Sequence, residues 1–197
     1  MRPSCRFSPT PNKYWRCPIA LVFACATIAV QAQPVQTPNL GGDHMNGSAG
    51  GWGLRAGYNG DYRKLALIYE TPTWWSHQSQ DGWGRLDLGA EFGVSYWEAR
   101  HGSPDSMWQL SATPMLRWWP SDYFYAEIGV GATVLSRTHF ADRDLSTAYQ
   151  FGNHIGVGTV FARAHRIGLR YSHFSNAGLK KPNPGLDVLQ LTYTYQF

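Results

Sequence analysis

Beyond Trp52, apolar and polar side chains alternate with a period of two. In residues 85–96 the apolar set is Leu86, Leu88, Ala90, Phe92, Val94 and Tyr96. The set between them is Arg85, Asp87, Gly89, Glu91, Gly93 and Ser95. A β-strand places two such sets on opposite faces, whereas a helix would scatter them around its circumference. This part of the chain is therefore predicted to be all-β.

The alternation divides the chain into about eight strands. They are predicted at residues 52–58, 63–75, 83–100, 106–119, 123–136, 148–162, 165–175 and 186–197. Several reach the roughly 9–11 residues that a tilted strand needs to cross a bilayer. Pro72 and Pro114 fall inside two of these segments. Because proline cannot donate to a ladder, we expect both strands to be bent or bulged there.

The polar faces collect charges of both signs in equal number. They are Arg55, Arg117, Arg166, Arg170, Glu70, Asp87, Glu91 and Glu127. Interleaved with Gly and Ser, these charges suit a narrow lumen filled with ion pairs. A soluble sandwich would instead bury the aliphatic face and expose the charged one. Alternation alone does not separate the two arrangements.

Three further features favour a membrane barrel. Residues 1–32 are typical of a cleaved signal peptide, with a basic stretch, the apolar segment 17–30 and small residues before Gln33, although an uncleaved anchor is an alternative. Aromatic side chains such as Trp118 and Trp119 cluster at strand ends, as at membrane interfaces. The last strand alternates to a terminal Phe197, a typical ending for outer-membrane proteins.

These features together predict an eight-stranded antiparallel up-and-down transmembrane β-barrel at residues 52–197, in the bacterial outer membrane. Residues 33–51 have no periodicity and are predicted to be a flexible lead-in. With both termini periplasmic, the connections at residues 138–147 and 176–185 would face the cell exterior.

Charge and cysteine content exclude several classes of function. Four of the 17 Lys and Arg residues lie in residues 1–32, which contain no acid. The remaining 13 match the 13 acidic residues, so no basic surface for nucleic acid is expected. All three cysteines (Cys5, Cys17 and Cys25) fall in the predicted leader. The processed chain is thus expected to have no disulfide, cysteine–metal site or thiol nucleophile.

Six of the seven histidines are predicted to be solvated or hydrogen-bonded rather than ligands. They are His44, His77, His101, His139, His154 and His165, of which His154 should point into the lumen. No spacing indicates a metal site, and no cofactor is expected. The seventh, His173, shares the outward face with Ser175, and Asp187 lies on the outward face of the next strand. Antiparallel neighbours can bring these side chains together.

Two interpretations of this trio stay open on the residues alone. The three polar side chains could mark only where the membrane ends, since a polar group costs little near the interface. Alternatively they form an acyl-transfer triad, with Ser175 as nucleophile, His173 as general base and Asp187 orienting the imidazole. The spacing permits this triad without requiring it.

The segment 170–197, RYSHFSNAGLKKPNPGLDVLQLTYTYQF, resembles the carboxy-terminal signature of the outer-membrane lipid A 3-O-deacylases, the PagL family. The shared features are His173-x-Ser175-Asn176, the Pro-Asn-x-Gly turn at residues 182–185 and the terminal aromatic strand. The resemblance implies an eight-stranded barrel with its active site on the lipid-facing wall. It also implies His173 as base and Ser175 as nucleophile.

Further roles follow from the same resemblance. Asn183, together with Asn176, would help to form the oxyanion hole. The family acid is usually Glu, and its position here holds Asp187, which is one methylene shorter. Lys180 and Lys181 lie in the same predicted external loop, where they could dock an anionic substrate or simply be solvated.

The resemblance implies a hydrolase that removes the ester-linked 3-hydroxyacyl chain at the 3-position of lipid A, without metal or cofactor. Its partners would be lipopolysaccharide and the outer membrane. Two alternatives remain: a non-catalytic structural or adhesive small barrel, and an outer-membrane phospholipase. The sequence leaves self-association into a homo-oligomer open.

Overall fold

The structure, a computed structural model, describes residues 49–197. The predicted signal peptide, the three cysteines, His44 and most of the predicted lead-in lie outside these residues. The strands are β1 (Gly51–Asn59), β2 (Tyr62–Glu70), β3 (Trp75–Gln78), β4 (Arg85–Ala99), β5 (Ser106–Trp119), β6 (Phe124–Leu135), β7 (His139–Phe140), β8 (Arg143–Asp144), β9 (Tyr149–Phe161), β10 (His165–Ser175) and β11 (Leu186–Gln196). No helix of the described residues has the length and apolarity needed to cross a membrane.

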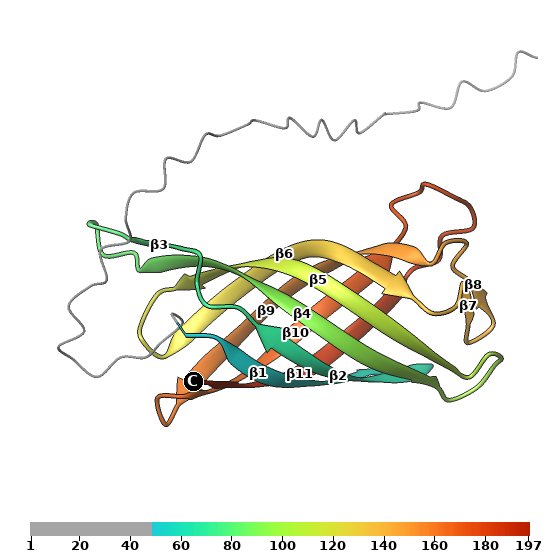
Figure 1. Cartoon of the computed structure of the whole chain (residues 1–197), viewed down its shortest axis with the longest axis horizontal. Coiled ribbons are helices and arrows are strands. Elements are labelled where there is room, and N and C mark those ends of the chain that lie inside the picture. The colour runs from blue at the N-terminus through green and yellow to red at the C-terminus, as the bar shows by residue number, and fades with distance from the viewer. Residues whose placement is uncertain (1–48) are drawn as a thin grey trace, which may run out of the picture. The chain divides into compact units, whose positions relative to one another are not determined.

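The long strands close into an antiparallel barrel (Figure 1). The order is β2-β1-β11-β10-β9-β6-β5-β4, and pairing of β2 with β4 completes the ring. The short β3 pairs with β4 where β2 has ended, so β2 and β3 together occupy one strand position of the barrel. The predicted eight-stranded barrel is confirmed. We call the end that holds residues 136–148 and 176–185 the loop end, and the opposite end, where Gly51 and Gln196 pair, the terminal end.

The two prolines inside predicted strands behave differently. At Pro72 the pairing is interrupted: it stops at Glu70↔Glu91 and resumes at Trp75↔Leu88, so four residues (71–74) lie opposite two (89–90). The expected bulge is therefore confirmed at Pro72.

Pro114 lies within an unbroken β5, and the bulge that was expected there is absent. The register against β6 is the same on both sides, Ala112↔Ala132 and Met115↔Gly129. In this register Pro114 faces Val130, whose two neighbours are Gly129 and Gly131, and a Cβ on Gly131 would lie 2.5 Å from the Thr113 Cα. Small neighbours allow the two backbones to approach, and the missing donor interrupts the ladder without shifting its register.

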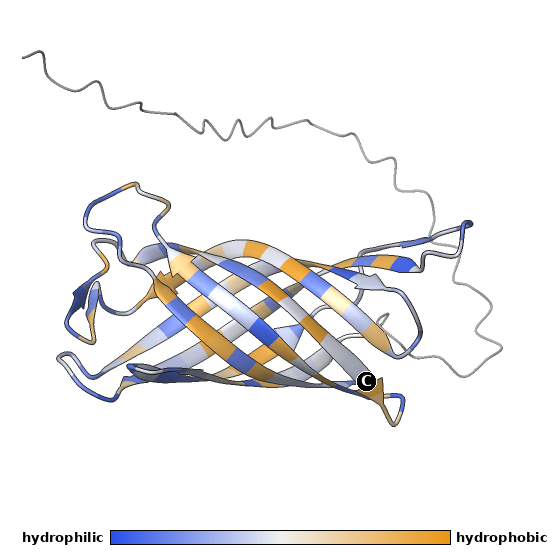
Figure 2. Ribbon diagram, turned by 180° about the vertical axis from the view of Figure 1, so that it is seen from behind, coloured by the Kyte–Doolittle hydropathy of each residue, from blue (hydrophilic) through white to orange (hydrophobic). Residues whose placement is uncertain are grey.

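The predicted lumen charges all point inward and are buried. Arg117 contacts Glu70 at 2.5 Å, Glu91 at 2.9 Å and Glu127 at 3.0 Å. Further pairs join Arg170 to Glu91 and Glu127, Arg55 to Glu91, and Arg166 to Glu70. The apolar side chains of the same strands are half-exposed on the outer wall, so hydropathy alternates along each ribbon (Figure 2).

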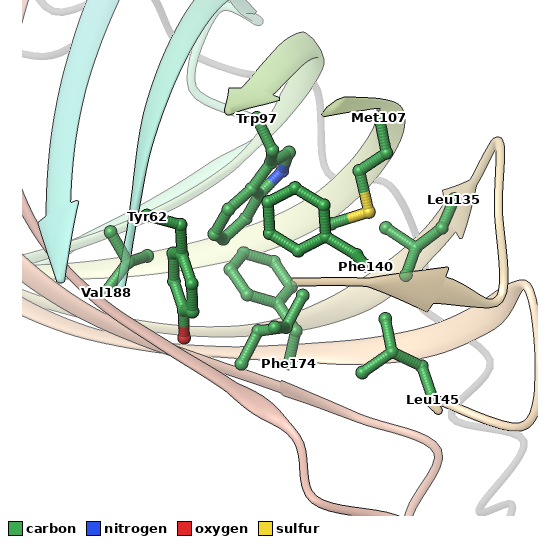
Figure 3. Packing of buried hydrophobic residues seen from close by; sticks show 9 residues of the cluster. Tyr62, Trp97, Met107, Leu135, Phe140, Leu145, Phe174 and Val188 are labelled. Carbon is green, nitrogen blue, oxygen red and sulfur yellow. The ribbon is translucent and has the colours of Figure 1, made fainter. Parts of the chain in front are cut away.

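A cluster of buried apolar side chains closes the lumen at the loop end (Figure 3). Its members are Tyr62, Trp97, Met107, Leu135, Phe140, Leu145, Phe174, Leu186 and Val188; we call them the plug. Phe140 comes from β7 and Leu145 from the segment after β8, so the loop at residues 136–148 folds back onto the barrel. Phe174 and Leu186 directly adjoin the outward residues His173 and Asp187, so plug packing anchors the backbone beneath them.

Candidate functional site

The candidate site lies on the β10–β11 hairpin near the loop end, where His173 pairs directly with Asp187. Their inward neighbours Phe174 and Leu186 are each 1% exposed. The side chains of His173 and Asp187, in contrast, are 38% and 43% exposed. Strand alternation thus turns the histidine and the carboxylate together onto the outer wall.

The imidazole and the carboxylate are in hydrogen-bond contact. His173 Nδ1 lies 2.7 Å from Asp187 Oδ1. The hydroxyl of Tyr171, two residues earlier on the outward face of β10, donates to the same oxygen at 2.6 Å. Because the two backbones face each other directly, the short Asp side chain reaches the ring. A carboxylate on Nδ1 fixes the tautomer that leaves Nε2 free to accept a proton.

A second set of contacts holds the backbone of Asp187. The Tyr62 hydroxyl donates to Asp187 O at 3.0 Å and accepts from Asp187 N at 2.9 Å. Asn59 Nδ2 donates to the same carbonyl at 2.9 Å. The ladder between β1 and β11 ends at Tyr58↔Leu189, so these two side chains continue it. Asp187 is therefore fixed at both its main chain and its carboxylate.

Gly185 packs against the imidazole from the connecting loop. Its φ is +67°, a conformation that favours glycine. A Cβ at this position would lie 2.7 Å from His173 Cε1 and 3.4 Å from Nε2. Any larger residue would thus displace the ring edge that carries Nε2.

Ser175 is the last residue of β10 and shares the outward face with His173. It is half-buried and pairs with Phe151 of β9, while the β10–β11 ladder has already ended at Phe174. Within residues 49–197 no hydrogen bond joins the Ser175 hydroxyl to His173. Catalytic hydrogen bonds are often long in unliganded structures and tighten when substrate binds.

The two predicted oxyanion residues lie in the loop that follows. Asn176 is fully buried, and its Nδ2 donates to Lys180 O at 2.9 Å and Leu145 O at 3.3 Å. Its side-chain amide would have to leave these carbonyls to serve a substrate. Asn183 Oδ1 accepts from Asn176 N at 3.2 Å, an arrangement that directs the Asn183 Nδ2 donor away from the Asn176 backbone.

The remaining predicted residues are distributed as follows. Lys180 and Lys181 are exposed in the same loop. His154 points into the lumen, as predicted, with Nδ1 2.7 Å from Ser172 Oγ. His165 is hydrogen-bonded, with its Nδ1 in contact with the Tyr193 hydroxyl. In the part of the chain that the structure describes, no three His, Cys, Asp or Glu residues are grouped as metal ligands would be.

The sequence did not predict the residues, other than His173, that form hydrogen bonds to Asp187. Tyr171 carried a signal, because it occupies the same outward row as His173. Tyr62 and Asn59 carried none, since they lie more than 120 residues from Asp187 and reach it only in the closed barrel. Chemically, the assembled group offers an oriented base beside a hydroxyl on one face, as in serine esterases.

Comparison with known proteins identifies the family of the chain. The sequence profile of the PagL family, lipid A 3-O-deacylase, matches residues 61–196. Lipid A deacylase PagL of Bordetella bronchiseptica is 54% identical over 180 residues, covering 91% of this chain and 93% of the relative. Lipid A deacylase PagL of Pseudomonas aeruginosa is 32% identical over 141 residues, covering 70% of this chain and 79% of the relative.

The fold agrees as well. The crystal structure of the outer membrane enzyme PagL matches with a TM-score of 0.61 and 30% identity, covering 75% of this chain and 99% of that one. The resemblance noted in the last 28 residues extends to residues 61–196, which include every barrel strand except β1. The chain therefore belongs to the lipid A 3-O-deacylase (PagL) family of outer-membrane enzymes.

Proposed function

We propose that this chain removes the ester-linked 3-hydroxyacyl chain at the 3-position of lipid A with a triad of Ser175, His173 and Asp187 on the lipid-facing wall. The observation that carries the proposal is the 2.7 Å contact between His173 Nδ1 and Asp187 Oδ1 on the outer face, with Ser175 on the same face of β10. Family membership supports the reaction, and this contact supports the residues.

In the proposed reaction, Ser175 Oγ attacks the ester carbonyl carbon while His173 Nε2 accepts the hydroxyl proton. Asp187 stabilises the imidazolium that forms. Collapse of the tetrahedral intermediate breaks the bond to the sugar oxygen, which takes the proton from His173. The acyl group then remains on Ser175. Water attacks this acyl-enzyme with His173 again as base, which releases the 3-hydroxy fatty acid and restores the serine.

The negative oxygen of the intermediate needs donors close to Ser175. We assign Asn183 Nδ2 to this role, because its Oδ1 is occupied by the backbone N–H of Asn176 and its amide therefore has a defined orientation. Asn176 contributes by holding the loop through its bonds to Lys180 and Leu145. The Ser146 hydroxyl donates a hydrogen bond to Pro182 O at 2.6 Å, which connects the loop at residues 136–148 to the same turn.

A site on the wall suits a lipid substrate. The acyl chains of lipid A lie beside the outward face, and its esters lie near the interface, where the loop end would be. Water reaches such a site from the headgroup side. Lys180 and Lys181 would attract the phosphates of lipid A at this level. A non-catalytic barrel has no need for a carboxylate oriented on a lipid-facing imidazole.

The proposal includes the processing of the chain. Residues 1–32 are removed on export, residues 33–50 form the lead-in and residues 51–197 form the barrel, which thus begins one residue earlier than the sequence predicted. The purified mature protein should then begin at Gln33 on N-terminal sequencing.

Mass spectrometry of lipid A from cells that express the protein tests the activity. The wild-type chain should remove one 3-hydroxyacyl group, whereas Ser175→Ala and His173→Ala should yield folded barrels that leave the lipid A mass unchanged. Ser172→Ala is a matched control, because this serine lies on the same strand but faces the lumen; its product should equal that of the wild type.

Two results would contradict the proposal. Trimming of lipid A by Ser175→Ala would exclude the assigned nucleophile. Release of fatty acids without a 3-hydroxyl group, with lipid A unchanged, would favour the phospholipase instead.

A further inference from the structure

Asn153 is a polar residue in an apolar part of the outer wall. It lies on β9, on the opposite side of His173 from Asp187, and pairs with His173 of β10 and Val130 of β6. Its outward neighbours along β9 are Phe151 and Ile155. Across the outer wall, Asn153 therefore lies between the aliphatic side chain of Val130 on one side and the His173–Asp187 pair on the other.

The amide of Asn153 is exposed and makes no hydrogen bond to any of residues 49–197. A polar group that faces lipid without a partner is unfavourable, and such groups commonly mark functional positions. Replacement by an aliphatic residue would suit the wall better. The amide is thus available to a partner that arrives with the lipid.

Its position relative to Ser175 limits what that partner is. Ser175 pairs with Phe151, and the His173–Asn153 pair lies two residues further from the loop end, a distance of about 6.8 Å along the strands. Side chains of directly opposed residues begin about 5 Å apart. An acyl chain whose carbonyl carbon lies at Ser175 and which descends toward the bilayer centre therefore passes over this pair.

The polar group closest to the carbonyl on that chain is the 3-hydroxyl, whose oxygen is three bonds from the carbonyl carbon. We propose that Asn153 binds the 3-hydroxyl of the acyl chain that is removed and so makes the enzyme selective for 3-hydroxyacyl esters. An Asn side chain offers both a donor and an acceptor, and a hydroxyl can use both. This inference rests on the proposed function, because it takes Ser175 as the position of the ester carbonyl.

The test is a kinetic comparison of two substrates with the purified mature protein in detergent micelles. Both are acylated glucosamine phosphates of equal chain length, and only one carries a hydroxyl on carbon 3 of the 3-O-acyl chain. We expect the wild type to favour the hydroxylated substrate by about tenfold in kcat/KM, the effect of one hydrogen bond to a neutral group. Asn153→Leu should lose this preference and retain its kcat/KM on the substrate without the hydroxyl.

Two further variants control for packing. Thr159→Leu removes a polar group from the outward face of the same strand, six residues closer to the terminal end, and should retain the wild-type preference. Asn153→Ala truncates the amide without adding bulk and should lose the preference as Asn153→Leu does. Heat-modified migration on electrophoresis gels reports whether each barrel has folded.

Several outcomes would overturn the inference. A wild-type enzyme without preference, or an Asn153→Leu enzyme that keeps it, excludes recognition of the hydroxyl by this amide. An equal loss on both substrates would also overturn it, because the amide would then serve the ester and not the hydroxyl. None of these results bears on the assignment of the triad. Only activity of Ser175→Ala on these substrates would contradict the proposed function itself.

Discussion

β10 carries two outward histidines, one at each end, and their surroundings differ. His165, at the terminal end, has its Nδ1 2.8 Å from the Tyr193 hydroxyl and stacks on Phe161 with ring centroids 5.4 Å apart. His173, at the loop end, has its Nδ1 on the Asp187 carboxylate. A phenol orients an imidazole but does not stabilise its charged form, whereas a carboxylate does both.

The two ends of β10 therefore differ in kind: the terminal end carries an aromatic cluster, and the loop end carries the candidate catalytic group. Around His165 the rings of Phe161, Tyr193 and Tyr195 form part of an aromatic belt, as expected near a membrane boundary. Around His173 a carboxylate, a hydroxyl and a serine replace those rings. Position at an interface therefore does not explain the loop-end group, because the terminal end meets the same requirement without it.

The largest predicted effect comes from removing the charge that distinguishes the two histidines. Asp187→Asn should lower kcat by about 10³- to 10⁴-fold, because the amide no longer stabilises the imidazolium or fixes its tautomer. The barrel should fold normally, since Tyr62 and Asn59 bind the main chain of residue 187 and not its carboxylate. Single-turnover kinetics on lipid A in micelles measures the loss.

His165→Ala is the matched control for this prediction. It removes the other outward histidine of β10, and its kcat should stay within about twofold of the wild type, since rim substitutions away from such a site have small effects. A comparable loss in both variants would mean that the measured effect reflects insertion of the hairpin and not catalysis.

A smaller effect is expected when the imidazole is displaced while its carboxylate is kept. Gly185→Ala places a methyl group 2.7 Å from His173 Cε1, so the ring must move. Misplacement of a catalytic group by about 1 Å lowers rates by about 10²-fold. The measurement is kcat with the same substrate, and KM should change little because the acyl-chain path along the wall is untouched.

Gly178→Ala controls for backbone strain in the same loop. Its φ is +81°, but a Cβ there would have no neighbour within 4 Å. It shares the unfavourable conformation without the contact to the ring. If Gly178→Ala were as slow as Gly185→Ala, loop strain and not displacement of His173 would account for both.

The features that were predicted correctly from the sequence have local causes. The period of two is a local property, so it correctly placed His173, Ser175 and Asp187 on one face and the lumen charges on the other. The alternation on both strands also made the His173–Asp187 pairing foreseeable. The break at Pro72 followed from one missing donor, again a local cause.

The parts that the sequence did not reveal depend on contacts between distant segments. Phe140 and Leu145 enter the plug because a loop folds back over the barrel, and Tyr62 meets Asp187 only when β1 pairs with β11. Pro114 was misjudged because the glycines that accommodate it lie on the neighbouring strand β6. Alternation contains no information on such neighbours.

The smallest predicted effect concerns the two tyrosines that contact these histidine sites. Tyr171 donates to the Asp187 carboxylate at 2.6 Å, whereas Tyr193 meets the imidazole of His165 directly. Tyr171→Phe should lower kcat by about tenfold, because one hydrogen bond to a charged carboxylate contributes at least about 1.5 kcal/mol. KM should not change, since the ring that faces the lipid is kept. Tyr193→Phe should leave both constants unchanged. If both variants lost activity equally, the hydroxyls would serve the membrane interface, and Tyr171 would have no separate part in orienting the acid.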